Sequence, residues 1–159
     1  MFKKLDFEYS GYVGGSNYKV ILTTDKDGII TAEYKQGEGY YNEKQPLKRT
    51  LTKDETEKVC KLIEECALST WNRSYRPEAE FILDGYFWNV FLDDSHIENG
   101  FGNNYTIVHG ENAYPWCFYK LIRAIIVAVP EFSEGLEHFA EEKTPVYRIE
   151  PLSELEVKI

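Results

Sequence analysis

The first third of the chain alternates between apolar and polar residues, with turn residues between the alternating stretches. Three stretches show the alternation: residues 7–12, 18–24 and 29–34. The side chains of half-buried strands follow this period of two. Asp27-Gly28 separates the last two stretches, and this pair favours a tight hairpin because primed turns require positive φ. The pattern predicts a three-stranded antiparallel meander, followed by a polar loop over residues 35–50.

The apolar spacing becomes helical after residue 51. Thr52 and Glu55 fit a capping box, in which each side chain bonds to the other residue's backbone N–H. Five residues that follow have the spacing of one helix face: Val59, Leu62, Ile63, Cys66 and Ala67. The sequence therefore predicts an amphipathic helix over residues 53–67.

The middle of the chain contains a long apolar stretch, Phe81 to Leu92, that has the composition of a strand. Trp88 and its alternate neighbours share one face, while Phe87 and Phe91 share the other. Apolar residues on both faces predict a strand that is central or covered on both sides. Asp93-Asp94-Ser95 is expected to form a turn, and Tyr105 to His109 the next strand.

A second helix is expected over residues 116–129, with Pro115 at its first position. Its only charged residues are Lys120 and Arg123, so it should be buried on more than one side. Two arrangements satisfy this requirement. Either the helix lies between the sheet and a second layer, or it meets a partner chain.

The last 29 residues contain eight Glu and carry a net charge of −5 out of −9 for the whole chain. Phe132, Leu136 and Phe139 fit a short helix, and residues 146–149 a strand. A strict alternation ends the chain, with apolar Leu155, Val157 and Ile159. We expect this tail to fold onto the chain's own body or onto another chain.

Together these elements predict an α+β fold. Residues 1–130 would form a mostly antiparallel sheet of about five or six strands with two principal helices, in the order β-β-β-α-β-β-α. Residues 131–159 would be an acidic C-terminal extension packed on the same domain. A length of 159 residues suits one domain.

The composition of the chain limits the classes of partner and the cellular compartment that we expect for the protein. Aromatic residues make up 15% of the chain, which excludes a disordered protein. The acidic net charge argues against nucleic acid and anionic membranes as partners. The longest apolar stretch, residues 121–129, is far too short for a membrane span, and no signal peptide is recognisable. Cys60, Cys66 and Cys117 form no paired motif, so we expect reduced thiols and a cytoplasmic protein.

Two groups of residues contain side chains that occur in catalytic or metal sites. Neither group has the sequence pattern that is typical of such a site. Asp94, His96 and Glu98 would share a strand face near Asp93, which is more typical of a solvated acidic edge than of metal ligands. Cys117 at a helix start, with His109 upstream, lacks the signature of a cysteine enzyme. The sequence thus predicts no catalytic residue, no metal and no cofactor.

One segment resembles small uncharacterised bacterial domains. The pattern consists of an aromatic pair after a helix, an Asp-Gly followed by Trp, and a Gly-x-Asn-x-Tyr-Pro run before an apolar helix. The matching residues are Trp71, Tyr75, Asp84-Gly85, Trp88 and Gly110-Glu111-Asn112-Ala113-Tyr114-Pro115. The resemblance implies a fold and a bacterial cytosolic origin without an activity. Its motifs are interpreted as structural: Gly110 for a tight backbone, Asn112 for turn hydrogen bonds and Pro115 for a helix start.

Aromatic residues at loops and element ends are the strongest candidates for function. Tyr and Trp give large contact areas at low entropy cost, and Tyr105 is one of them. The candidate ligand- or partner-binding residues are Tyr40, Tyr41, Trp71, Tyr75, Trp88, Asn112, Tyr114 and Trp116. The leading hypothesis is a non-enzymatic protein-binding module, inhibitor-like or immunity-like, with a basic partner.

An alternative is a small-molecule binder or enzyme with an aromatic-lined pocket between helix and sheet. Trp71, Tyr75, Trp88 and Tyr114 would line that pocket. Self-association through the last apolar helix or the tail strand is compatible with either hypothesis.

Overall fold

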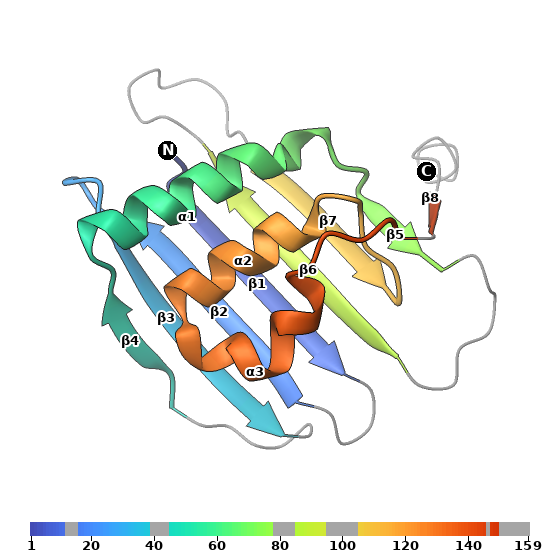
Figure 1. Cartoon of the computed structure of the whole chain (residues 1–159). Helices are drawn as coiled ribbons and strands as arrows, with labels where there is room; N and C mark the ends of the chain where they lie inside the picture. Colours follow the sequence, from blue (N-terminus) through green and yellow to red (C-terminus); the bar gives the residue numbers. More distant parts are fainter. Residues whose placement is uncertain (12–15, 39–44, 78–84, 95–104, 146, 150–159) are drawn as a thin grey trace, which may run out of the picture.

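The computed structural model describes residues 1–11, 16–38, 45–77, 85–94, 105–145 and 147–149. They form one eight-stranded sheet with the order β4-β3-β2-β1-β6-β7-β5-β8. All pairs of neighbouring strands are antiparallel except β5 and β7, which are parallel. The helices lie together across one face of this sheet (Figure 1). The predicted α+β class with a mostly antiparallel sheet is confirmed.

The predicted meander comprises β1 (Lys4–Gly11), β2 (Ser16–Thr24) and β3 (Ile30–Glu38). The β2–β3 turn is longer than a two-residue primed turn. Its Asp25 carboxylate accepts hydrogen bonds from the N–H groups of Asp27 (2.8 Å) and Ile29 (3.0 Å), and Gly28 has φ of 77°. The prediction of a loop over residues 35–50 was wrong at both ends, because β3 continues to Glu38 and β4 (Leu47–Thr50) pairs with it.

The second half of the sheet contains four strands: β5 (Ser74–Arg76), β6 (Tyr86–Asp93), β7 (Tyr105–Glu111) and β8 (Arg148–Ile149). The turn predicted at residues 93–95 starts too early, since Asp93 still pairs with Tyr105. The sheet exceeds the five or six predicted strands because β4, β5 and β8 have four, three and two residues. Such short segments contain too few residues for an alternation to be recognised.

Helix α1 (Lys53–Cys66) confirms the first predicted helix and its capping box. The Thr52 hydroxyl accepts from the Glu55 N–H (3.1 Å), and the Glu55 carboxylate accepts from the Thr52 N–H (3.0 Å). The helix ends at Cys66 because Ala67 adopts the left-handed conformation, with φ of 49°. A short 3-10 turn, η1 (Leu68–Thr70), follows and leads towards β5.

Helix α2 (Phe118–Ala128) starts three residues after Pro115, so the predicted start was too early. Residues 115–117 instead form a turn, in which the Pro115 carbonyl accepts from the Phe118 N–H (3.1 Å). The chain itself covers α2, with α1 on one side and a compact segment on another. That segment consists of η3 (Pro130–Phe132), the single-turn α3 (Ser133–Leu136) and η4 (Glu137–Phe139).

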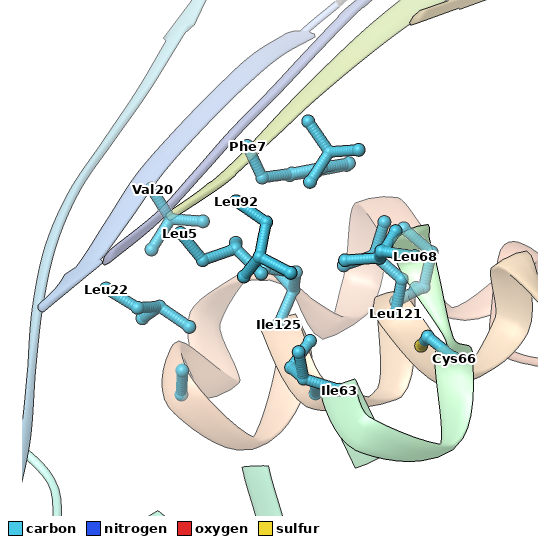
Figure 2. Packing of buried hydrophobic residues seen from close by; sticks show 14 of the residues in the cluster. Leu5, Phe7, Val20, Leu22, Ile63, Cys66, Leu68, Leu92, Leu121 and Ile125 are labelled. Atoms are coloured by element: carbon cyan, nitrogen blue, oxygen red, sulfur yellow. The ribbon is translucent and has the colours of Figure 1, made fainter. Parts of the chain in front are cut away.

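The hydrophobic core fills the space between the helices and the sheet (Figure 2). Its strand residues, such as Leu5, Val20 and Leu92, point towards α1 and α2. Phe132, Leu136 and Phe139 belong to the same buried cluster, so the first part of the acidic extension packs on the body of the protein. The alternating end of the chain lies outside the described residues. Within the described ranges, no helix combines the length and apolar character needed to cross a bilayer.

Candidate functional site

Three of the predicted binding residues are part of the core. Trp88 is fully buried, Tyr75 is 2% exposed and Trp71 is 9% exposed. The Trp88 ring lies 6.2 Å from the ring centres of both Trp71 and Tyr75. Their polar groups are bonded internally: the Trp88 indole donates to the Ala113 carbonyl (2.9 Å) and the Trp71 indole to the Cys66 carbonyl (2.8 Å). These rings contact one another directly, and neither of the two grooves described below is lined by them.

The remaining predicted residues are dispersed. Asn112 has φ of 52°, and its side-chain oxygen accepts from the Tyr86 N–H (2.8 Å). Tyr114 is half-buried against the rings of Phe118 and Phe139. Trp116 is 51% exposed in the turn before α2. The predicted contacts at residues 40 and 41 fall outside the described residues.

The structure places the Cys117 thiol and the His109 imidazole on opposite sides of the sheet. His109 is exposed on the face of β7 opposite the core, whereas the Cys117 thiol donates to the Cys66 carbonyl (3.5 Å) on the helical side. All three cysteines are free thiols. Burial raises the pKa of the Cys66 thiol to about 12, so it stays protonated at neutral pH. Among the residues placed by the structure, no cluster of His, Cys, Asp and Glu could hold a metal ion.

The sheet face opposite the helices carries an exposed apolar group on β6 and β7. We call this group the open-face patch: Phe87, Phe91, Tyr105 and Ile107. Ile107 is 60% exposed, Tyr105 48% and Phe87 37%. Phe91 lies directly opposite Ile107 in the strand register, and its ring stacks on Tyr105 at 5.3 Å. Phe91, Tyr105 and Ile107 thus form one apolar cluster in contact with solvent, and Phe87 lies apart from it on the same face, beyond the Asn89–His109 pair.

Of the two arrangements predicted for β6, the structure shows the first, because the strand is central in the sheet but only one of its faces is covered by the helices. Trp88, Val90 and Leu92 are buried under the helices, as expected, but Phe87 on the other face is exposed. The strand is central in the sheet, between β1 and β7. The sequence signal was correct, since apolar residues do occupy both faces. The spacing of apolar residues does not show whether a strand face is covered by other parts of the chain or exposed to solvent.

Charged residues of both signs surround the open-face patch. Glu8 forms an ion pair with Lys19 (3.5 Å), and Arg76 with Glu111 (3.0 Å). Asp6 is half-buried between Phe91 and Ile21 in the register of β1, and this burial raises the pKa of its carboxyl. A shallow hollow of about 160 Å³ extends the face over β2 and β3, beside Ile21. This apolar centre with a charged rim resembles the anatomy of protein–protein interfaces.

A groove of about 820 Å³ lies where the C-terminal half of α1 faces the N-terminal segment and the ends of β6 and β7, and Tyr105 of the open-face patch also lines it. We call it the α1 groove and define it by six lining residues: Phe2, Ile63, Glu64, Leu92, Asp94 and Thr106. No local pattern in the sequence indicates this groove, because its walls come from the N-terminal segment, α1, β6 and β7. It lies between helix and sheet, but not among the predicted aromatic residues.

Exposed carboxylates concentrate on the helical side of the molecule. Between η3 and residue 142, five glutamates are exposed: Glu131, Glu134, Glu137, Glu141 and Glu142. Only Glu141 forms an ion pair with a residue in the described ranges, at 3.9 Å from Lys143. Residues 131–142 therefore carry five acidic side chains and no Lys or Arg.

No known family model matches the sequence, and no curated protein shows significant similarity to it. The resemblance to small bacterial domains therefore stays a prediction.

Proposed function

We propose that the protein is a non-enzymatic binding module that receives a partner protein on its open-face patch. The observation that carries the proposal is the exposure of Phe87, Tyr105 and Ile107 on one sheet face. Monomeric proteins rarely expose contiguous large apolar groups without a functional reason. Aromatic residues at the centre of such a surface are typical of binding hot spots.

The charges favour a partner with basic residues. Docking would desolvate the Asp6 carboxylate further, and a cation on the partner would offset that cost. The net charge of −9 would also steer a basic protein towards this chain. An inhibitor-like or immunity-like role against a basic target fits these features. The free thiols fit a reducing compartment such as the cytosol as the place of action.

The proposal can be tested with two variants of equal exposure. Ile107 on the patch and Leu47 on β4 are both 60% exposed. We expect Ile107→Glu to abolish recovery of a stoichiometric partner from the native host, because a charge would enter the apolar centre. Leu47→Glu should retain the partner. Co-purification with quantitative mass spectrometry measures both, and thermal unfolding verifies that each variant folds.

The same comparison can contradict the proposal. If both variants recover the same proteins in the same amounts as the natural chain, the patch does not bind them. If light scattering shows a dimer that Ile107→Glu converts to a monomer, the occupant is a second copy of the chain. That result would replace the basic partner proposed above.

A further inference from the structure

The first half of β7, residues 105–108, has a free edge within the described part of the sheet. Strand β5 pairs with β7 only at His109 and Gly110, and the His109 N–H donates to the Arg73 carbonyl (2.9 Å) on that side. Backbone groups along a strand alternate in direction, so the N–H and C=O of Ile107 point to the same side. No backbone group in the described ranges bonds to them there.

This free edge is unprotected. Proteins usually cover an exposed strand edge or place charges on it, because it otherwise pairs with another strand. The outermost strand at the other end of the sheet, β4, carries Lys48 and Arg49. Residues 105–108 are Tyr-Thr-Ile-Val, without a charge, and Ile107 is 60% exposed. We therefore expect another strand to cover this edge.

The last described strand leads the chain towards the free edge. Strand β8 is antiparallel to β5, and β5 is parallel to β7, so β8 runs antiparallel to β7. In the register, Ile149 lies opposite Tyr75, and Tyr75 lies opposite Gly110. The direction of the chain at Ile149 therefore leads from the level of Gly110 towards the levels of Ile107 and Tyr105.

Residues 150–159, which we call the C-terminal tail, have a length and a pattern that suit this edge. Strands β8 and β7 are two strand spacings apart, about 10 Å, and about three extended residues span that distance. Residues 153–159 are then left for pairing, and their sequence Ser-Glu-Leu-Glu-Val-Lys-Ile alternates between polar and apolar residues.

The edge of β4 is a poor alternative for the tail of the same chain. It lies at the opposite end of the sheet from β8. Seven strand spacings separate the two ends, about 34 Å. Ten fully extended residues reach about 33 Å, so no residue of the tail would be left to pair there.

We propose that residues 153–159 pair with residues 105–108 of the same chain as an antiparallel strand. The side chains of Leu155 and Val157 lie on the open face beside Ile107 and Tyr105, where cross-strand contacts remove apolar surface from water. The tether favours the chain's own tail over that of a second copy, because it gives an effective concentration in the millimolar range. This contact goes beyond the proposed function, since it forms without any partner protein.

Hydrogen exchange at single backbone amides of the full chain tests the pairing. The Ile107 N–H points to the proposed strand, the Val108 N–H points to β6, and the His109 N–H is bonded on the β5 side. We expect the Ile107 amide to be protected from exchange in the natural chain. The double variant Leu155→Ser, Val157→Ser should speed its exchange about tenfold and leave the Val108 and His109 amides unchanged.

The matched control is the double variant Glu154→Ser, Glu156→Ser. It places the same number of serines in the same segment but keeps the alternate apolar side chains, so the exchange of Ile107 should change by less than about twofold. The Val108 and His109 amides verify in each sample that β7 is folded. A change at Ile107 alone therefore cannot come from unfolding of the sheet.

Three results would overturn the inference. The first is an Ile107 amide that exchanges without protection in the natural chain. The second is equal protection in the Leu155→Ser, Val157→Ser variant, which would mean that the tail does not cover this edge. The third is protection that rises with protein concentration, which would assign the strand to a second copy. The experiment contains no partner protein, so this inference and the proposed function fail separately.

Discussion

At the scale of single residues, the Gly110–Pro115 motif before α2 has a role in packing. A side chain at Gly110 would place its Cβ 2.4 Å from the Trp88 ring and 2.5 Å from the Ala113 carbonyl oxygen. Asn112 occupies a left-handed conformation and accepts from the Tyr86 N–H. The interpretation of Gly110 as a tight-backbone residue is confirmed, whereas the Asn112 side chain bonds to β6 and not within a turn. Pro115 was expected to start the helix, but it precedes α2 by one turn.

Gly110→Ala tests this packing. The added methyl group must displace the fully buried Trp88 indole or the backbone, so we expect a loss of about 1–3 kcal/mol in the free energy of unfolding. Urea denaturation measures the loss, and near-ultraviolet circular dichroism reports the Trp88 environment. His109→Ala, on the exposed face of the same strand, should change stability by less than about 0.5 kcal/mol.

Equal stability of Gly110→Ala and the natural chain would show that the Trp88 ring has room to shift. The tight contact between β7 and β6 would then not explain the glycine. A loss in His109→Ala as large as that in Gly110→Ala would mean that β7 is sensitive to any substitution, irrespective of packing.

At the scale of elements, the end of α2 depends on a strand that the sequence did not reveal. Helix α2 has no basic residue in its last turn, which leaves its final carbonyl groups without a cation from the helix itself. Arg49 of β4 supplies one. Its guanidinium donates to the carbonyls of Ala128 (2.8 Å) and Val127 (3.4 Å), and pairs with Glu55 at 2.7 Å.

Arg49→Met should therefore destabilise the fold. It removes a cation from the negative end of the helix dipole and leaves two carbonyl groups unsatisfied, a loss of about 2 kcal/mol. Lys48→Met is the matched control, because Lys48 is the exposed neighbour on the same strand and should cost less than about 0.5 kcal/mol. Chemical denaturation of both variants checks the difference. If the two losses are equal, Arg49 does not act through the end of α2.

Long elements were easier to predict from the sequence than short ones. Helix α1 has a capping box and several turns of apolar spacing, so its position was predictable to one residue. The four residues of β4 are mostly polar, and its role is defined by Arg49 reaching a helix almost eighty residues later. Long-range pairing of this kind has no local signal. The candidate surfaces were unpredictable for the same reason, since each is assembled from strands or segments distant in the chain.

At the scale of the whole molecule, the apolar residues on the two faces of the sheet have different roles. Those on one face form the core, and those on the other are proposed to bind a partner. All helices of the described chain lie on one face of the sheet (Figure 1), so the core forms there. The aromatic content indicates folding, and most of it does fill the core. A smaller part, including Phe87 and Phe91, lies on the open face, opposite the face of β6 that carries Trp88. The sequence feature that indicated the open-face patch was the presence of apolar residues on both faces of β6.

Adjacent residues of β7 allow these two roles to be measured. Ile107 faces solvent, whereas Val108 is 1% exposed and faces the helices. We expect Val108→Thr to lose about 1–3 kcal/mol of stability, because a hydroxyl enters the core. Ile107→Thr should change stability by less than about 0.5 kcal/mol and yet weaken partner binding.

Both variants place the same residue type on the same strand, so the β-propensity of threonine cancels from the comparison. Urea denaturation gives the two stability changes, and quantitative co-purification gives the two binding changes. If Ile107→Thr costs as much stability as Val108→Thr, the open face is stabilised by contacts within the chain. Its apolar residues would then be explained by folding alone, and the patch would no longer support the proposal of a binding partner. If only binding falls, solvent exposure at Ile107 is maintained for recognition.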